Sequence, residues 1–145
     1  MWKTKNNYPL NAFRICVDRI GDDVEGRAYS PLKKDAVEFV GMGNLLVQMD
    51  ELFDRVGYPQ AFQDKRSFGM DKEGMNLYKG IPQGQLDAEN IIGQSGRQKT
   101  MDVMVVSRKN TSWQGELYDA DGDFLQNFNG EIELLAGVME FANIS

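Results

Sequence analysis

The chain repeats part of its own sequence, and this repeat limits the folds that it can adopt. When the 145-residue sequence is shifted against itself by 89 positions without a gap, eight identical pairs align over about forty positions. The pairs are Arg19/Arg108, Gly26/Gly115, Tyr29/Tyr118, Phe39/Phe128, Gly41/Gly130, Leu45/Leu134, Leu46/Leu135 and Glu51/Glu140. Self-similarity at a fixed spacing is typical of tandem structural units. We therefore predict two copies of one unit, residues 13–56 and 102–143.

Each copy begins with a predicted hairpin. In "FRICVDR" the residues Phe13, Ile15 and Val17 alternate with more polar ones, which is the period of a strand with one buried face. The matching "VMVVSR" is apolar at nearly every position, so we expect a more central strand, covered on both faces, with Met104 and Val106 facing inward. The turn-forming segments "IGDD" and "KNTS" then lead into strands that carry the shared glycine and tyrosine.

A third strand and a helix complete each copy. Turns at "SPLKKD" and "DADGD" precede short strands that end near Phe39 and Phe128. After Gly41 and Gly130 the apolar residues recur at helical spacing. The first helical set is Leu45, Leu46, Met49, Leu52, Phe53 and Val56, and the second is Ile132, Leu135, Val138, Met139 and Ala142. Each copy is therefore predicted to be a βββα unit.

The two copies are expected to share one hydrophobic core. A unit of about forty residues buries too little apolar surface to be stable alone. We expect a single α+β domain over residues 1–145, with a mostly antiparallel six-stranded sheet, two helices and a pseudo-two-fold axis. Gly137 interrupts the second predicted helix, and we expect another backbone to approach it there.

The segment between the copies, residues 57–101, has no sustained period. Its net charge is +1, against −7 for the rest of the chain, and the two values give the overall −6. Long connections inside a compact domain tend to be functional. We expect "GYPQAF" and "RSF" to pack on the domain through their aromatic residues, and "PQGQLDAENIIGQSGRQ" to be exposed and mobile.

Residues suited to catalysis are scarce. The sequence has no histidine, which removes the commonest general base and metal ligand. Its one cysteine, Cys16, lies in a predicted strand and can form neither an internal disulfide nor a cysteine-based zinc cluster. Twenty-two acidic residues are present, but no spacing selects a catalytic pair among them. We therefore expect a protein without enzymatic activity, metal or cofactor.

Three partial motifs lack a residue that their chemistry requires. "GQSGRQKT" has Gln98 where a phosphate loop needs a glycine, and "GMGNLL" has Leu46 in place of the third glycine of a dinucleotide site. "DADGDF" has Phe124 where a calcium loop needs its glycine. We interpret the second as a strand-to-helix turn and the third as a hairpin tip.

The stretch "SWQGELYD" holds the best candidates for binding. In one interpretation Trp113 caps the end of the sheet, at the position that Val24 has in the first copy. In the other, aromatic and polar residues form an exposed patch with the composition of an interaction hot spot. The members of this predicted patch are Trp113, Gln114, Tyr118, Tyr29 and Arg66.

Arg66, in "DKRSF", also has two interpretations. It either fastens the middle segment to the acidic domain through packed aromatic rings and carboxylates, or contacts a partner beside Trp113.

Charge and hydropathy narrow the classes of partner. A net charge of −6 disfavours broad attraction to phosphate backbones or anionic lipid. No apolar run suits a membrane span or a signal sequence, so we expect a cytoplasmic protein. The favoured function is binding or regulation through a protein partner. The alternative is single-stranded nucleic-acid binding, because sheet-and-helix repeats of this kind resemble the Whirly and PUR-type proteins, which stack bases on aromatic side chains.

Three stretches carry a resemblance to a protein family. The segments "NTSWQGELYD" and "YPQAFQDKRSF", with the pattern F-x-G-x-x-x-LL-x-x-M/V, resemble a group of small uncharacterised proteins found in Clostridia and related gut bacteria. The resemblance covers most of the chain and implies a bacterial protein with the same strand, turn and helix arrangement. It brings no known activity with it.

Overall fold

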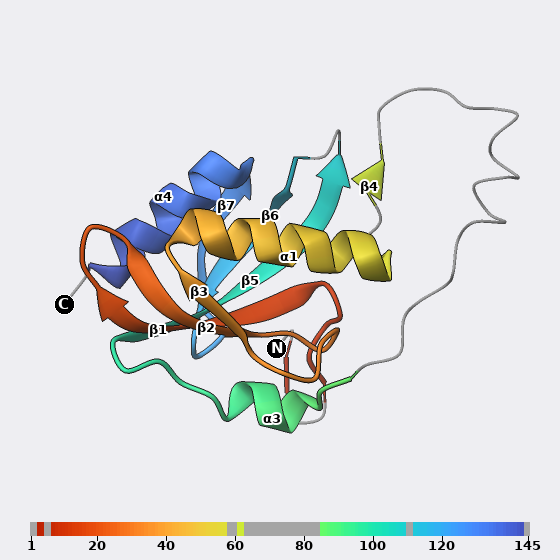
Figure 1. Ribbon diagram of the computed structural model, residues 1–145, viewed down its shortest axis with the longest axis horizontal. Coiled ribbons are helices and arrows are strands. Elements are labelled where there is room, and N and C mark those ends of the chain that lie inside the picture. Colours follow the sequence, from red (N-terminus) through yellow and green to blue (C-terminus); the bar gives the residue numbers. More distant parts are fainter. Residues whose placement is uncertain (1–2, 5–6, 58–60, 63–84, 110–111, 144–145) are drawn as a thin grey trace, which may run out of the picture.

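The structure is a computed structural model that describes residues 3–4, 7–57, 61–62, 85–109 and 112–143. Figure 1 shows one twisted sheet with α1 and α4 on one face and α3 on the other. The six longer strands lie in the order β3-β2-β1-β5-β6-β7, and each neighbouring pair is antiparallel. The predicted α+β class and the six-stranded antiparallel sheet are therefore confirmed.

The elements follow one another as two series of three strands and a helix, joined by a connection. The first series is β1 (Ala12–Ile20), β2 (Val24–Tyr29), β3 (Val37–Val40) and α1 (Met42–Val56). The connection contains β4 (Ala61–Phe62) and α3 (Ala88–Ile92). The second series is β5 (Lys99–Lys109), β6 (Gln114–Asp119), β7 (Phe124–Asn129) and α4 (Glu131–Ala142). Neither α3 nor β4, which pairs in parallel with β5, was predicted from the sequence.

Two glycines start the helices that pack on the sheet. Gly41 has φ 92° and Gly130 has φ 121°, a region that side chains disfavour. The N–H of Gly41 donates to the carbonyl of Val24 at 2.8 Å, and the N–H of Gly130 donates to that of Trp113 at 2.7 Å. The predicted change from strand to helix at these glycines is confirmed.

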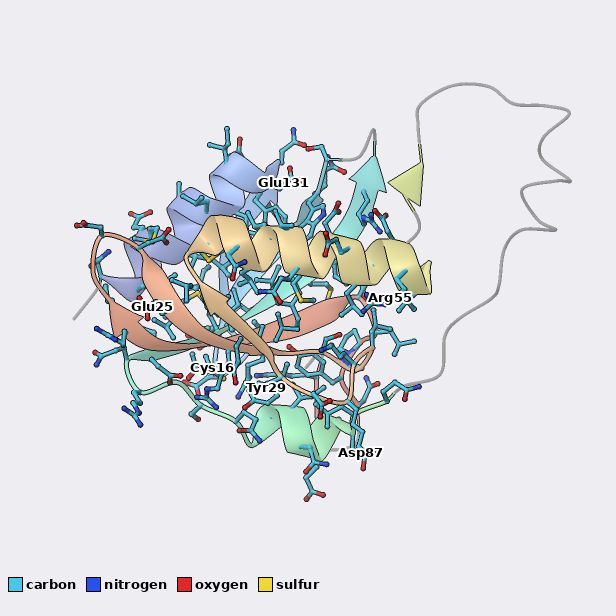
Figure 2. The ribbon with its side chains drawn as sticks, in the orientation of Figure 1. Cys16, Glu25, Tyr29, Arg55, Asp87 and Glu131 are labelled. Carbon is cyan, nitrogen blue, oxygen red and sulfur yellow. The ribbon has the colours of Figure 1, made fainter. Side chains whose placement is uncertain are left out.

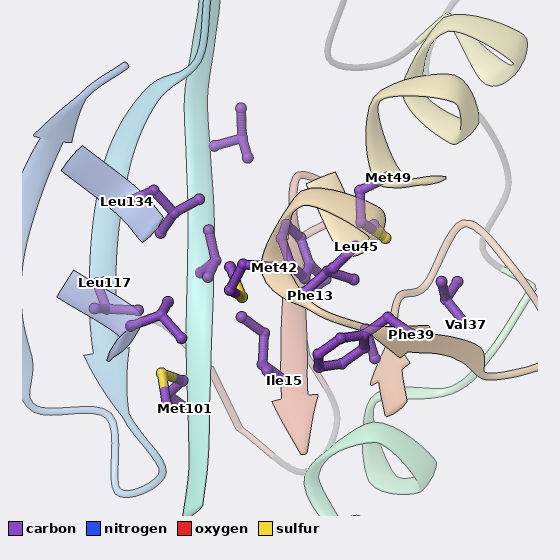
Figure 3. Close-up of a cluster of buried hydrophobic side chains, with 14 of the residues drawn as sticks. Phe13, Ile15, Val37, Phe39, Met42, Leu45, Met49, Met101, Leu117 and Leu134 are labelled. Atoms are coloured by element: carbon purple, nitrogen blue, oxygen red, sulfur yellow. The ribbon is translucent and has the colours of Figure 1, made fainter. Parts of the chain in front are cut away.

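The core lies between the sheet and the pair α1 and α4 (Figure 3). Phe13, Ile15 and Val17 of β1 face it as predicted, and all three are fully buried. The prediction for β5 was wrong, because its core residues are Met101, Val103 and Val105. Val106, predicted to face inward, is 59% exposed. Met104, predicted to face inward as well, packs instead beside the cluster of Tyr8, Ala12 and Ile91 near α3.

A difference in hairpin length explains the error in β5. Three residues connect Ile20 to Val24, whereas four connect Lys109 to Gln114. The shift of 89 therefore suits β6 but places β5 one residue out of register. Since side chains alternate between the faces of a strand, a one-residue slip exchanges the buried and exposed sets. β1 is also central and buried on both faces, so it shares the environment that was predicted for β5 alone.

The two helices match the predictions to different degrees. In α1 the buried residues include Leu45, Met49, Leu52 and Phe53, as predicted. In α4 the buried residues are Leu134, Gly137, Val138 and Ala142, whereas Ile132 is 83% exposed and Leu135 faces solvent. Val138, Met139 and Ala142 pack on the core as predicted. Because α4 carries apolar residues around most of its circumference, its periodicity also selected two exposed residues, Ile132 and Leu135.

The neighbour of Gly137 also differs from the prediction. A Cβ atom at Gly137 would lie 2.7 Å from Nε2 of Gln126, a β7 side chain that fills the space beside the helix. The group that approaches Gly137 is therefore a side-chain amide, and the expectation of a close backbone was wrong.

Candidate binding surface

Trp113 lies in the core and not on the surface. Its side chain is fully buried, and its ring centroid is 6.0 Å from that of Phe13 and 5.5 Å from that of Phe53. Its Nε1–H donates to Oδ1 of Asp50 on α1 at 2.9 Å. Trp113 therefore joins the start of β6 to α1 and does not belong to an exposed patch.

Arg108 strengthens the same junction. Its buried guanidinium donates to Asp50 Oδ1 at 3.2 Å and also to Asp54, and it lies 5.5 Å from the ring centroid of Phe53. Asp50 thus accepts from both Trp113 and Arg108. This end of the sheet is an internal contact between α1, β5 and β6.

Three other predicted patch residues, Tyr29, Gln114 and Tyr118, lie on the face of the sheet opposite α1 and α4, which we call the outer face. Tyr29 is opposite Arg14 on β1, Arg14 is opposite Asp102 on β5, and Asp102 is opposite Tyr118 on β6. The two tyrosines thus end a row of four residues across four strands. Figure 2 shows Tyr29 on the same side of the sheet as α3. The row separates Tyr29 from Tyr118, so they do not form one patch.

A buried polar network fills the middle of this row. Asp102 is fully buried and accepts hydrogen bonds from Lys3 Nζ at 2.8 Å, Tyr8 Oη at 2.7 Å, and Arg14 Nε and Nη2 at 3.0 Å each. Arg14 also donates to the carbonyls of Ile92 and Gln94. The network therefore fastens the N-terminal segment and the connection to the sheet.

The network also affects the titration of its members. Burial, reinforced by the Asp102 carboxylate, raises the pKa of Tyr8 well above its ordinary value. Burial lowers the pKa of Arg14, but the hydrogen bonds and charge of Asp102 outweigh this effect, so the pKa is raised overall. Tyr8 therefore stays neutral and Arg14 stays charged at neutral pH. Sequence reasoning missed this network, although Arg14 and Asp102 interrupt the otherwise apolar stretches 12–17 and 101–106 of the two central strands.

Most of residues 85–98 are exposed, as predicted for the end of the connection, but a few of them contact the rest of the domain. Ile91 of α3 is fully buried and packs with Tyr8 and Ala12. The N–H of Gln98 donates to the carbonyl of Val17 at 2.8 Å, and Arg27 donates to the carbonyl of Ser95 at 2.9 Å. A five-residue helix is too short to show a period in the sequence, so its single buried residue gave no signal.

Gln114 and Tyr118 do lie together on an exposed part of the outer face. We call this area the β6–β7 outer patch, and it consists of Val106, Gln114, Glu116, Tyr118, Phe124 and Asn127. Phe124 is 54% exposed, and its ring meets that of Tyr118 edge to face with centroids 5.9 Å apart. Within the described part of the chain, no helix covers this patch.

Hydrogen bonds hold the side chains of the β6–β7 outer patch in place. The hydroxyl of Tyr118 donates to Glu116, and Ser107 Oγ donates to Gln114 Oε1 at 2.7 Å. Burial and the hydrogen bond to Glu116 raise the pKa of Tyr118 to about 12, so the hydroxyl is a neutral donor at neutral pH. Of the predicted site residues, this patch thus contains Gln114 and Tyr118, while Arg66 lies outside the described residues.

The stretch from β6 to α4, which contains most of this patch, is acidic. From Gln114 to Asn143 the chain has seven acidic residues and neither lysine nor arginine. The outer face of β1 and β2 differs, because its charged side chains form ion pairs. Arg27 forms two bonds to Asp18, at 2.9 Å and 3.0 Å, beside a shallow depression of about 530 Å³. No set of unpaired charged groups converges in that depression.

The described residues offer little for metal or nucleophilic chemistry. They contain no group of three or more side chains able to hold a metal ion. Burial raises the pKa of the Cys16 thiol to about 11, so it is protonated at neutral pH. "DADGDF" forms a hairpin turn in which Asp119 Oδ1 accepts from the N–H groups of Asp121 and Asp123. None of the described helices has the length and apolar character to cross a bilayer.

Comparisons of the chain with protein-family models, curated proteins and solved structures find no match. The resemblance to small clostridial proteins therefore stays a prediction.

Proposed function

We propose that the protein is a non-enzymatic binding or regulatory module, acting in the cytoplasm through a protein partner that contacts the β6–β7 outer patch. The observation that carries this proposal is the contact of the half-buried Tyr118 ring with the exposed Phe124 ring, with polar groups of fixed geometry around them. Aromatic residues within a polar rim are typical of protein interfaces. Phe124 was not among the residues predicted for the site.

The charge of this half of the sheet disfavours nucleic acid as the partner. Binding of a single strand requires cations along its phosphates, and residues 114–143 supply none. Single-stranded nucleic-acid binding therefore remains the alternative to be tested and not the favoured function.

Capture of partners by wild type and by two variants tests the proposal. Phe124→Ser removes an exposed ring from the patch, and Val40→Ser is the control because Val40 is 72% exposed on β3 at the other end of the sheet. A captured protein is purified, and its affinity is measured by calorimetry. We expect Phe124→Ser to weaken binding about tenfold or more and Val40→Ser to leave it unchanged.

A titration with labelled single-stranded DNA and RNA at low salt examines the alternative. Salt-dependent binding of the nucleic acid, together with equal protein capture by wild type and Phe124→Ser, would overturn the proposal.

We also propose that the chain arose by tandem duplication and has a pseudo-two-fold axis between β1 and β5. Three observations support this. The strand pairing of Arg14 with Asp102 is flanked by Tyr29 on one side and Tyr118 on the other. Bulges interrupt both first hairpins, after Val17 and after Val105. The helix-start glycines make matching bonds: Gly41 donates its N–H to Val24, the first residue of β2, and Gly130 donates its N–H to Trp113, the residue before β6.

A further inference from the structure

The two edge strands of the sheet, β3 and β7, are protected differently. At the β3 edge, Asn44 Oδ1 accepts from the N–H of Val40 at 3.1 Å, and Gln48 Nε2 donates to the carbonyl of Glu38 at 2.8 Å. Both bonds come from α1, the helix that follows β3. The outward main-chain groups at these two positions of β3 are therefore occupied by side chains of the same chain.

The β7 edge has a counterpart to the first of these two bonds but not to the second. Glu133 Oε1 accepts from the N–H of Asn129 at 2.9 Å, as Asn44 does for Val40. Gln48 is the seventh residue after Gly41, and the seventh residue after Gly130 is Gly137, which has no side chain. Among the described residues, no side chain of α4 bonds to the main chain of Asn127, the β7 position that corresponds to Glu38.

The alternation of the β7 backbone turns Asn127 away from β6. The N–H of Gly130 donates to the carbonyl of Trp113, so the main-chain N–H and C=O groups of Gly130 point toward β6. In an antiparallel pair, the main-chain groups of every second residue before Gly130 do the same. The main-chain N–H and C=O groups of Asn127 and Asn129 therefore point away from β6, to the open side of the sheet. A bulge at Leu125 ends the regular edge, so Asn127 is the uncapped outward position between this bulge and Asn129, whose N–H Glu133 accepts.

β7 also lacks the features that usually prevent pairing at an edge. Natural edge strands are commonly blocked by charged residues, especially lysine, or by proline. The sequence of β7, "FLQNFN", has none of these, and it is six residues long against four in β3. An unblocked edge of this kind can accept an extended segment through main-chain hydrogen bonds.

The charge around β7 selects the kind of segment. The seven acidic residues between Gln114 and Asn143, without a lysine or arginine, attract a cationic segment. They oppose the pairing of β7 with β7 of a second copy, because like charges would then face each other.

We propose that the β7 edge binds a basic, extended segment of the partner as an added strand. This inference rests on the proposed function and adds the binding mode and the chemistry of the partner. The main chain of the segment pairs with Asn127, and its side chains on one face lie beside the exposed ring of Phe124. A lysine or arginine of the segment pairs with Glu133, whose carboxylate now caps Asn129.

The test uses a fluorescein-labelled synthetic peptide of alternating lysine and valine, with binding measured by fluorescence anisotropy. A peptide of the same sequence with an N-methyl group on every residue keeps its side-chain charges but has no main-chain N–H to donate along either edge. We expect the first peptide to bind with an affinity that falls as salt increases, and the methylated peptide to bind at least about tenfold more weakly. Equal binding of the two peptides would show attraction by charge alone and overturn strand addition.

Two proline variants locate the binding edge. Asn127→Pro removes an outward N–H without breaking the ladder to β6, and Glu38→Pro makes the matched change at the β3 edge. Only Asn127→Pro should weaken binding of the peptide, by about tenfold or more. If Asn127→Pro does not fold, amide exchange in the wild type decides, because strand addition requires the peptide to protect Asn127 and its neighbours.

The remaining outcomes separate this inference from the proposed function. If the purified partner depends on Phe124 but binds Asn127→Pro normally, the outer patch is the site and the added strand is wrong. If sedimentation shows a dimer that Asn127→Pro abolishes, a second copy occupies the edge and the basic segment is wrong. If no partner depends on Phe124 while the peptide protects Asn127, the edge binds basic segments and the proposed role of the patch fails.

Discussion

The half of the sheet formed by β1–β3 with α1 pairs its charges, as in Arg27 with Asp18, and caps its edge strand twice. The half formed by β5–β7 with α4 has an acidic stretch from Gln114 to Asn143, an aromatic pair in which Phe124 is exposed, and an edge strand capped once. The strand order and helix positions are nevertheless the same in both halves. The comparison shows that a few positions outside the strand framework, such as Gln48 against Gly137, decide how completely each edge strand is capped.

The largest predicted effect concerns the place where the halves meet. Asp102→Ala leaves the buried cations of Arg14 and Lys3 without their carboxylate, so we expect a loss of about 3–5 kcal/mol in the free energy of unfolding. Urea unfolding followed by circular dichroism and tryptophan fluorescence measures this loss, and both signals should show one shared transition. Asp123→Ala, at an exposed turn position, is the control and should change the free energy by less than about 0.5 kcal/mol. Two separated transitions would mean that the halves fold independently.

The next prediction compares Val24 with Trp113, the two residues whose carbonyls accept the N–H groups of Gly41 and Gly130. Trp113 and Val24 both accept the N–H of a helix-start glycine, and both are fully buried. Trp113→Ala should cost about 3–5 kcal/mol, because it removes a large ring and its bond to Asp50. Val24→Ala removes two carbon atoms and should cost about 2 kcal/mol. Equal losses in urea unfolding would contradict a larger role for Trp113.

The smallest predicted effect concerns the paired charges of the first half. The hydrogen bond from Arg27 lowers the pKa of Asp18, so the ionised carboxylate favours the folded state. This contribution is complete above the unfolded pKa, about 3.9, and is lost as the pH falls through the lower folded value. We expect Asp18→Asn to lower stability by about 0.5 kcal/mol near neutral pH and to have no effect near pH 2.

Val106 provides the control for this pH dependence. It occupies the bulge of the second half, as Asp18 does in the first, and carries no charge. Val106→Asn should therefore give the same small change in stability at both pH values. A loss for Asp18→Asn that persists in acid would show that packing, and not charge, is responsible.

The repeat in the sequence was sufficient to predict the fold class, the strand order within each half and the glycines that start the helices. It could not predict the faces of β5, because one extra residue in a hairpin exchanges the two sides of a strand without changing its composition. The buried side of α4 was only partly predictable, for another reason. Ile132 and Leu134 are both apolar, and only the packing on the sheet distinguishes them.

The candidate surface was predicted in part. Gln114 and Tyr118 were identified because aromatic and polar residues together are typical of interaction hot spots. Trp113 was ambiguous because aromatic residues serve cores and interfaces equally well. Phe124 was read only as a missing glycine in a calcium loop. The difference between Gln48 and Gly137 becomes meaningful only when the edges of the sheet are known, since a helix glycine alone does not indicate which carbonyl it leaves uncapped.

The pairing of β1 with β5 has a consequence for how the protein folds. Hairpins such as β1–β2 connect residues close in sequence and can form within about 1–10 μs. The central pair instead joins Ala12 to Met104, so the sheet is complete only after a long loop has closed. Such distant pairing slows folding. The entropy of closure grows only with the logarithm of loop length, about 0.6 kcal/mol for each doubling. The connection between the halves can therefore be lengthened considerably, even by an inserted domain, at little cost in stability.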